Sequence, residues 1–224
     1  MEGFSGKTGW VEVICGPMFS GKTEELIRRL RRAAIARKHV EVFKPTLDDR
    51  FSQTEIVSHS LMRIHAQVIE DAREIYTRCS SACDVVGIDE ANFIGPKLVD
   101  VAQFLAGRGK RVIIAGLDTD YLGRPFPPIP ELLACAESVV KLLAICVRCG
   151  SPAKNTQRLR GSAELLMVGA AEAYEARCRH CFEPAPPSKR DLEAQGVFHM
   201  NGVSPTRAPI NGPLRCRTRR MGEF

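Results

Sequence analysis

A glycine-rich segment near the start of the chain carries the residues whose chemistry is easiest to predict. It matches the pattern GxxxxGK[ST] and consists of Gly16, Pro17, Met18, Phe19, Ser20, Gly21, Lys22 and Thr23. Glycines permit backbone conformations in which successive N–H groups converge on phosphate oxygens, and a following helix adds partial positive charge. Lys22 can reach the β- and γ-phosphates, and the Thr23 hydroxyl can bind Mg²⁺. The pattern therefore predicts a phosphate-binding loop, in preference to a corner that is glycine-rich by chance.

Two neighbouring carboxylates, Asp89 and Glu90, follow an aliphatic run that begins at Val85. In nucleoside-triphosphate folds an acid at such a position lies beside the phosphate loop and holds Mg²⁺. We assign Asp89 to the magnesium sphere, and Glu90 is then free to accept a proton from an attacking hydroxyl or water. Alone, the pair would be equally typical of two acids that end a strand, so the phosphate loop decides between the two interpretations.

Four of the nine cysteines form two CxxC pairs, Cys146 with Cys149 and Cys178 with Cys181. Each pair places two thiolates on one tight turn, and four thiolates make the closed tetrahedral site typical of structural Zn²⁺. The alternative interpretation is a set of unligated or redox-active thiols. His180, inside the second pair, is expected to be an exposed bystander. A zinc ion here would fix both ends of residues 150–177, a construction that suits a lid.

The residues around these motifs alternate between short aliphatic strands and amphipathic helices. Strands are expected at residues 11–15, 40–43, 84–89 and 111–116. Helices are expected after Thr23 and around residues 98–105. Nearly continuous aliphatic runs suit central parallel strands, so we predict an α/β domain with a central parallel sheet. The first helix also carries four arginines that we expect on a solvated face, namely Arg28, Arg29, Arg31 and Arg32.

Composition excludes several classes of protein. The 224 residues are 44% hydrophobic and 26% charged, ordinary values for one globular domain with an appendage. No apolar run is long enough to span a bilayer, and residues 1–7 lack a basic segment followed by an apolar one. We therefore expect neither a membrane anchor nor a signal peptide. Nine cysteines in such a chain favour the reducing cytoplasm and a metal site over a disulfide framework.

Changes in composition and hydrophobic periodicity divide the chain into three parts. Residues 9–145 are expected to form the nucleotide-binding domain, residues 146–182 a zinc-binding domain, and residues 183–224 a disordered basic tail. The net charge of +6 is enough to attract phosphate. The cysteine pairs lack the interleaved aromatic residues that stack on bases, so a nucleic-acid partner is not favoured. A zinc-ribbon nucleic-acid-binding protein is the non-enzymatic alternative.

Taken in order, these residues resemble the type II thymidine kinase family, a cytosolic, tetrameric class. The resemblance covers about residues 9–182. Beside the phosphate loop and the cysteine pairs it includes Asp89-Glu90-Ala91-Asn92-Phe93, Asp48-Asp49-Arg50, Leu117-Asp118, Arg124-Pro125-Phe126, residues 136–142 and Thr156-Gln157-Arg158. It implies a RecA-like P-loop domain with a small zinc-anchored lasso domain, assembled as a homotetramer. It also implies that ATP, with Mg²⁺, phosphorylates the 5′-hydroxyl of thymidine in the salvage of pyrimidine deoxynucleosides.

The same resemblance assigns roles to individual residues. Glu90 falls at the family's proton acceptor, Lys22 supplies positive charge, and Arg50 approaches the 5′-oxygen and the transferring phosphoryl group. The implied ATP-binding set is the phosphate loop together with Asp89, Glu90, Ala91 and Asn92. The implied thymidine-binding set is Met18, Asp48, Arg50, Asn92, Phe93, Leu117, Tyr121, Met167, Val168, Gly169 and Tyr174.

Two positions depart from the family's usual pattern. Asn92 stands where the family commonly has Gln, and Ala170 stands where it has a second glycine. The shorter side chain of Asn92 is expected to weaken its contact toward the sugar, and Ala170 disfavours the positive φ that a glycine would allow in the lasso. The alternative enzymatic interpretation is a P-loop ATPase or a kinase of another nucleoside, because Glu90 could activate water as readily as a hydroxyl.

Overall fold

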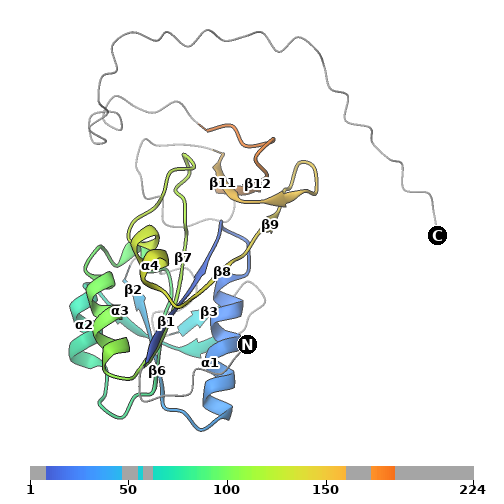
Figure 1. Cartoon of the computed structure of the whole chain (residues 1–224). Coiled ribbons are helices and arrows are strands. Elements are labelled where there is room, and N and C mark those ends of the chain that lie inside the picture. The colour runs from blue at the N-terminus through green and yellow to red at the C-terminus, as the bar shows by residue number, and fades with distance from the viewer. Residues whose placement is uncertain (1–8, 47–54, 58–62, 160–172, 185–224) are drawn as a thin grey trace, which may run out of the picture. The chain divides into compact units, whose positions relative to one another are not determined.

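Six parallel strands form the central sheet of the protein (Figure 1). The structure is a computed structural model that describes residues 9–46, 55–57, 63–159 and 173–184. Across the sheet the strands run β5 (Gln67–Ile69), β2 (Val40–Pro45), β6 (Val85–Ile88), β7 (Arg111–Gly116), β1 (Trp10–Cys15) and β8 (Ser138–Lys141). All neighbouring pairs are parallel. The predicted α/β class and its central parallel sheet are therefore confirmed.

The four strands predicted from aliphatic runs are β1, β2, β6 and β7. Every residue of β6 is buried, and so are five of the six residues in β1 and in β7. The sequence analysis did not predict the two edge strands, β5 and β8. The order of the sheet places β7 between β1 and β6, so the strand before the phosphate loop does not pair with the strand before Asp89.

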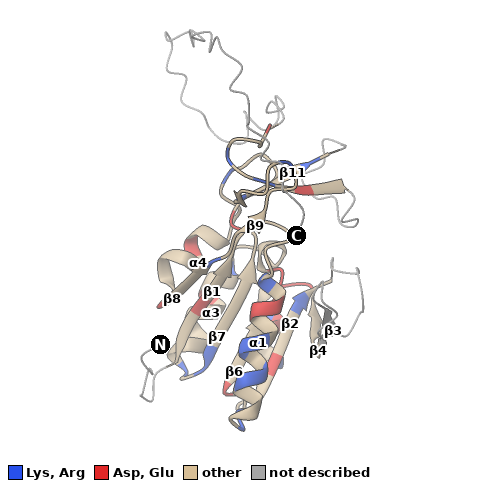
Figure 2. Ribbon diagram, turned by 90° about the vertical axis from the view of Figure 1, so that its right-hand side faces the viewer, with Lys and Arg blue, Asp and Glu red and all other residues tan. Residues whose placement is uncertain are grey.

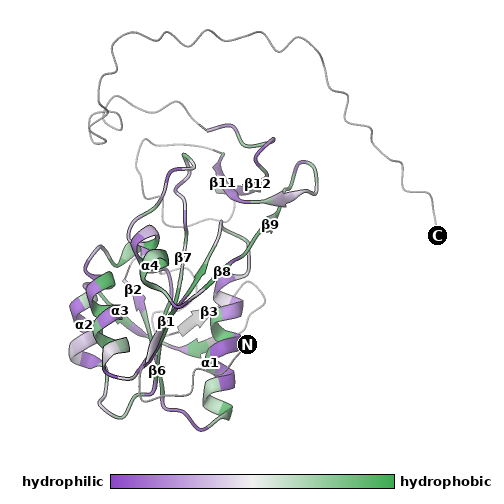
Figure 3. Cartoon of the chain, viewed as in Figure 1, coloured by the Kyte–Doolittle hydropathy of each residue, from purple (hydrophilic) through white to green (hydrophobic). Residues whose placement is uncertain are grey.

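Helices cover both faces of the sheet (Figure 1). On one face α1 (Lys22–Ile35) buries Leu26, Ile27 and Leu30 against the strands. On the other face lie α2 (Ala72–Arg78), α3 (Leu98–Gly107) and α4 (Ile129–Cys135). A short 3-10 helix, η1 (Ala91–Phe93), follows β6. Figure 3 shows hydrophobic and hydrophilic residues alternating along α1, as expected for a helix with one buried side.

One expectation for α1 was wrong. Its first turn is acidic and basic residues follow (Figure 2), but the four arginines do not share a solvated face. Arg29 is only 4% exposed, and its guanidinium pairs with the buried carboxylate of Glu12 on β1 at 2.5 Å. Glu25 also accepts from Arg29, at 2.7 Å. Burying an arginine requires such partners, and a pattern of arginines along one helix cannot show that a strand supplies them.

Shorter strands form three two-stranded ribbons. These are β3 (Glu55–Val57) with β4 (Arg63–His65), β9 (Ala144–Ile145) with β10 (Pro152–Ala153), and β11 (Asn155–Arg158) with β12 (Tyr174–Arg177). The first CxxC pair lies in the turn between β9 and β10, and the second follows β12. All described residues belong to one unit that extends to Pro186. Among the described helices, none has both the length and the apolar character needed to cross a membrane.

Candidate active site

The backbone of the predicted phosphate loop requires its glycines. The loop leaves the end of β1 and leads into α1. Gly16 has a φ of +146°, and a Cβ at this position would lie 2.3 Å from the carbonyl oxygen of Leu142. Gly21, with a φ of +82°, is the residue that precedes α1. Because residues with a Cβ resist both conformations, the pattern of glycines in the sequence has a direct structural cause.

Two side chains of the loop fold back onto its own backbone. The Lys22 ammonium and the Ser20 hydroxyl both donate hydrogen bonds to the carbonyl oxygen of Pro17, each at 2.8 Å. Lys22 is thus held over the loop, at the beginning of a helix whose N-terminus attracts anions. This arrangement is suited to bind the terminal phosphates of a nucleotide.

The two motifs predicted to share a magnesium ion do meet in the structure. The Thr23 hydroxyl donates to Oδ2 of Asp89 at 3.0 Å, although 66 positions separate the two residues. The other oxygen of Asp89 accepts from the backbone N–H of Glu90, also at 3.0 Å. Hydroxyl and carboxylate oxygens are the ligands that Mg²⁺ prefers, so this pair fits the ion that the sequence analysis assigned to it.

Glu90 lies in an unusual backbone conformation. Its φ is +49°, in the left-handed region that side chains other than glycine rarely adopt. The residue lies between the end of β6 and η1 and caps η1, where its carbonyl accepts from the N–H of Phe93 at 3.0 Å. Such strain is typical of functional sites, where surrounding structure holds a residue in place. Asp89 is buried and Glu90 is partly exposed, so the neighbouring carboxylates have different environments.

Asn92, which the family resemblance assigns to the binding site, has a structural contact in the protein itself. Its side-chain oxygen accepts from the backbone N–H of Leu117 at 3.0 Å, which ties η1 to the loop after β7. Its Nδ2 is buried and has no hydrogen-bond partner among the described residues. Phe93 packs edge-to-face on Phe126, with ring centroids 6.0 Å apart. The structure thus brings Asn92, Phe93 and Leu117 into one region, but the Asn92 oxygen contacts protein backbone.

The Arg158 side chain contacts two tyrosines, Tyr121 and Tyr174, that the family resemblance assigns to the thymidine site. Its guanidinium carbon lies 3.7 Å from the centroid of the Tyr121 ring and 5.5 Å from that of Tyr174. It also donates to the Tyr174 hydroxyl at 3.0 Å. In the sequence Arg158 belongs to a segment that resembles the family, but no role for it follows from that resemblance. Its position between two aromatic rings depends on the pairing of β11 with β12, which no local pattern shows.

An ion pair between a buried carboxylate and an exposed lysine is a second feature that sequence reasoning missed. Asp118, at the end of β7, is 6% exposed, and Lys141 of β8 contacts its Oδ2 at 2.5 Å. Oδ1 of Asp118 has no hydrogen-bond partner among the described residues. Both residues lie in segments that the analysis quoted for the resemblance, which was the only available signal.

Five of the predicted site residues lie outside the described residues. They are Asp48, Arg50, Met167, Val168 and Gly169, and Ala170 lies there too.

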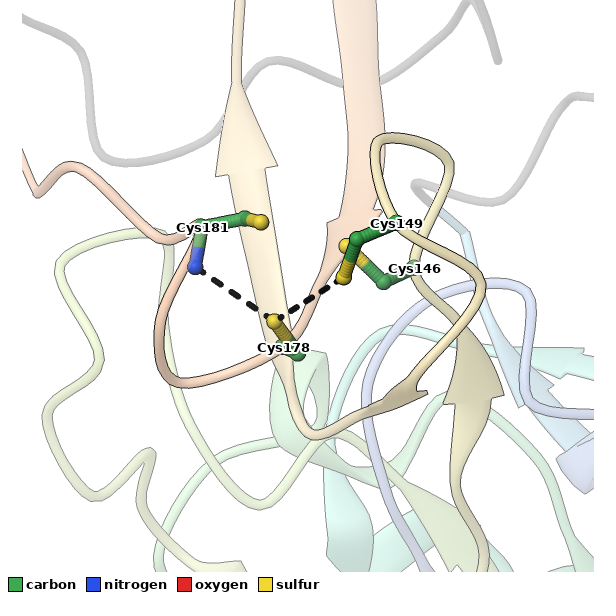
Figure 4. Close-up of side chains that lie close together, drawn as sticks. All are labelled: Cys146, Cys149, Cys178 and Cys181. Atoms are coloured by element: carbon green, nitrogen blue, oxygen red, sulfur yellow. Dashed lines mark hydrogen bonds between the residues drawn. The ribbon is translucent and has the colours of Figure 1, made fainter. Parts of the chain in front are cut away.

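The four cysteines of the CxxC pairs converge from two turns (Figure 4). Their sulfur atoms all lie within 4.8 Å of one another, and those of Cys149 and Cys178 are 3.6 Å apart. The backbone N–H of Cys181 donates to the Cys178 sulfur at 3.4 Å. Burial raises the pKa of the Cys146 thiol, but backbone hydrogen bonds from Cys178, Arg148 and Cys149 outweigh it and lower this pKa to about 6. Such a set fits a tetrahedral structural zinc ion, and His180 is exposed as expected.

The cysteine cluster packs directly against the phosphate loop. Phe19, in the middle of the loop, contacts the small core formed by Cys146, Cys178 and neighbouring alanines. The backbone N–H of Met18 donates to the hydroxyl of Thr156 on β11 at 3.0 Å. The cysteine cluster and β11 therefore support the loop that is suited to bind phosphate, a relation that the spacing of the motifs in the sequence does not predict.

The parallel α/β fold, the phosphate loop and the acid beside Thr23 define a P-loop nucleotide-binding protein with a four-cysteine cluster that could hold a metal ion. Comparison with known proteins narrows the class. The thymidine kinase family matches residues 9–182, and the chain belongs to that family. It is 56% identical over 183 residues to a thymidine kinase of Rhodothermus sp. (strain ITI 518), covering 82% of this chain and 85% of the relative.

A second relative gives the same result. It is a thymidine kinase of Bdellovibrio bacteriovorus (strain ATCC 15356 / DSM 50701 / NCIMB 9529 / HD100), 56% identical over 176 residues, which cover 79% of this chain and 86% of the relative. The family predicted from the motifs is therefore confirmed.

Proposed function

We propose that the protein transfers the γ-phosphoryl group of ATP to the 5′-hydroxyl of thymidine, yielding dTMP and ADP. Membership of the thymidine kinase family supports the reaction. The observation that carries the assignment of residues is the 3.0 Å contact between Thr23 and Asp89, because it joins the phosphate loop to the segment after β6 that contains Glu90. Phosphoryl transfer needs such positioning and charge neutralisation more than covalent catalysis.

Each group has a defined part in the proposed reaction. The 5′-oxygen forms a bond to the γ-phosphorus as the bond from that phosphorus to the bridging oxygen of ADP breaks, and Glu90 accepts the hydroxyl proton. Lys22 and the loop N–H groups bind the phosphates. Arg50 is included because the family resemblance places it near the 5′-oxygen and the transferring phosphoryl group. Thr23 and Asp89 would hold Mg²⁺, which when bound neutralises phosphate charge.

For thymidine, the proposed site combines described and undescribed residues. The described ones are Met18, Asn92, Phe93, Leu117, Tyr121 and Tyr174, and the others are Asp48, Met167, Val168 and Gly169. Arg158 supports this assignment, since it contacts the rings of both Tyr121 and Tyr174. Apolar contact with the thymine methyl is worth only about 1 kcal/mol, so hydrogen bonds must supply most of the selectivity.

The remaining expectations also belong to this proposal. Residues 9–145 would form the nucleotide-binding domain, residues 146–182 a zinc-anchored lasso and residues 183–224 a tail. The active form would be a cytoplasmic homotetramer that serves pyrimidine deoxynucleoside salvage. The donor set supports zinc as the lasso's ion, because four thiolates favour Zn²⁺ over Mg²⁺ or Ca²⁺.

A nucleoside-panel assay tests the reaction. ADP formation is measured with ATP and Mg²⁺ alone and with thymidine, deoxyuridine, deoxycytidine or deoxyadenosine, and the nucleotide product is identified by mass spectrometry. We expect ADP release to depend on thymidine and to match dTMP formation one to one. Equal ADP release without any nucleoside would indicate an ATPase, and preference for another nucleoside would contradict the assigned substrate.

A further inference from the structure

Three potential metal ligands that the proposed reaction does not use lie together elsewhere in the molecule. Glu41 is the second residue of β2, Cys79 follows the last residue of α2, and Cys83 precedes β6. Their ligand atoms, one carboxylate oxygen and two sulfurs, all lie within 4.8 Å of one another. Because the phosphate loop follows the carboxyl end of β1 in a parallel sheet, the amino ends of β2 and β6 lie at the opposite edge.

The turn that carries both cysteines is fixed from two sides. The backbone N–H of Ser80 donates to the Glu41 carboxylate at 3.1 and 3.3 Å. The Lys110 ammonium donates to the carbonyl oxygens of Cys83 at 2.7 Å and of Ser80 at 2.9 Å. The Glu41 carboxylate itself accepts the first of these bonds, the Cys79 thiol contacts the Ser80 carbonyl oxygen at 3.8 Å, and the turn holds the carboxylate and the thiols close together. The three ligands are therefore arranged before any ion binds, which reduces the entropy cost of binding one.

Charge and exposure at this cluster also suit a divalent ion. Two thiolates and one carboxylate carry three negative charges, so a divalent ion leaves one, which the Lys110 ammonium balances. Cys83 is buried, whereas Glu41 and Cys79 are partly exposed, so solvent has access to the cluster. The spacing of the cysteines, CxxxC, lies within the range of two to four intervening residues that zinc ligands use.

We propose that Glu41, Cys79 and Cys83 bind a second zinc ion, at the edge of the sheet opposite the phosphate loop. Two Zn–S bonds and one Zn–O bond form, the two thiol protons pass to solvent, and a water molecule completes the tetrahedron. Nothing is oxidised or reduced. The present contact of the Cys83 thiol with the carbonyl oxygen of Val85, at 3.2 Å, is exchanged for the bond to the metal.

Zinc stoichiometry of the full-length chain tests the site. The protein is purified under reducing conditions, exposed to zinc salt alone, desalted and analysed by mass spectrometry for metal content. We expect two zinc ions per chain in the natural protein and one in Glu41→Gln and in Cys79→Ser. The matched control Cys135→Ser changes a partly buried cysteine outside both clusters and should retain two. Cys178→Ala should retain the ion at the new site.

Further measurements separate loss of a ligand from loss of the fold. Thermal melting shows whether Glu41→Gln and Cys79→Ser remain folded, and thymidine-dependent ADP release in both should match that of the natural protein. In the Cys178→Ala chain, Co²⁺ should give a thiolate charge-transfer band that disappears on adding Cys79→Ser. One zinc ion in the natural chain, two in folded Cys79→Ser, or a Cys79–Cys83 disulfide formed while the cluster stays free of zinc would each overturn the site.

Discussion

The neighbouring carboxylates Asp89 and Glu90 show how backbone conformation can separate two chemically similar residues. Asp89 is buried and accepts hydrogen bonds from Thr23 and from the N–H of Glu90. Glu90 turns into the left-handed region and remains partly exposed. In the proposed reaction the buried acid would hold the ion beside the loop, and the partly exposed acid would face the substrate. The proposed division of roles follows from these two environments.

Replacing Glu90 by glutamine tests its role at the scale of one residue. Glu90→Gln keeps the size of the side chain but removes the proton acceptor, so we expect kcat for thymidine to fall at least ~10²-fold. The Kd for ATP, measured by calorimetry, should change little because the phosphate loop is intact. Unchanged turnover would remove Glu90 from the mechanism.

A pair of glycine substitutions tests the phosphate loop. In Gly16→Ala the new Cβ meets the Leu142 carbonyl at 2.3 Å, so we expect loss of ATP binding and a lower free energy of unfolding. The matched control is Gly107→Ala at the end of α3, where a Cβ has no neighbour within 4 Å. That change should stabilise the protein by up to about 1 kcal/mol and leave ATP binding unchanged. Equal effects of the two substitutions in urea unfolding and calorimetry would contradict this account.

At the scale of elements, the four-cysteine cluster and β11 pack directly against the phosphate loop. Phe19 packs on the core of the cysteine cluster, and Met18 is bonded to Thr156 of β11. The small core shared by the ribbons β9–β10 and β11–β12 contains five buried residues, two of them cysteines of the cluster, so a metal ion held there would supply much of their stability. We therefore expect a zinc ion in this cluster to affect nucleotide binding as well as the segment between the cysteine pairs.

Removal of one zinc ligand tests this coupling. Cys178→Ala should lose the zinc ion of the four-cysteine cluster, and the KM for ATP should rise roughly tenfold, equivalent to about 1.4 kcal/mol of lost support for the loop. His180→Ala, in the same turn but exposed, is the matched control and should change neither quantity. A normal KM for ATP in a Cys178→Ala chain without that zinc ion would show that the loop does not depend on the metal.

At the scale of the whole molecule, the unit that contains the site ends at Pro186. Its last described residues are attached to β11 by two hydrogen bonds. The Gln157 side-chain amide donates to the Glu183 carbonyl oxygen at 3.0 Å, and its oxygen accepts from the Glu183 N–H at 2.9 Å. The predicted start of the tail at residue 183 therefore lies too close to the ordered contacts to serve as a truncation point. Residue 187 is the better boundary for a truncated chain.

Two truncations test this boundary. A chain ending at Pro186 should keep its melting temperature and its thymidine kinase activity within about twofold, because no described contact is removed. A chain ending at Phe182 loses both bonds to Gln157, each worth about 1 kcal/mol, and should melt at a lower temperature. Loss of activity in the longer chain would assign the segment 187–224 a part in catalysis or assembly.

The sequence alone determined the features that depend on local spacing. Aliphatic runs predicted β1, β2, β6 and β7, because buried parallel strands need apolar residues on both faces. Glycine positions predicted the phosphate loop, and the CxxC pairs predicted the metal site, because the residues that matter lie within a few positions of each other. The ordered matches then identified the family. Each of these features is defined by residue type within a short window of the chain.

Only the tertiary structure decided which distant residues meet. The order of the sheet inserts β7 between β1 and β6, and it places Glu12 beneath Arg29 and Lys141 beside Asp118. Pairing of β11 with β12 is what sets Arg158 beside Tyr174. These contacts join positions 16, 17 and 23 residues apart, and their free energy depends on burial that no short window of sequence contains. For that reason the sequence predicts the phosphate-binding chemistry of the loop, but it does not predict that the cysteine cluster packs against the loop.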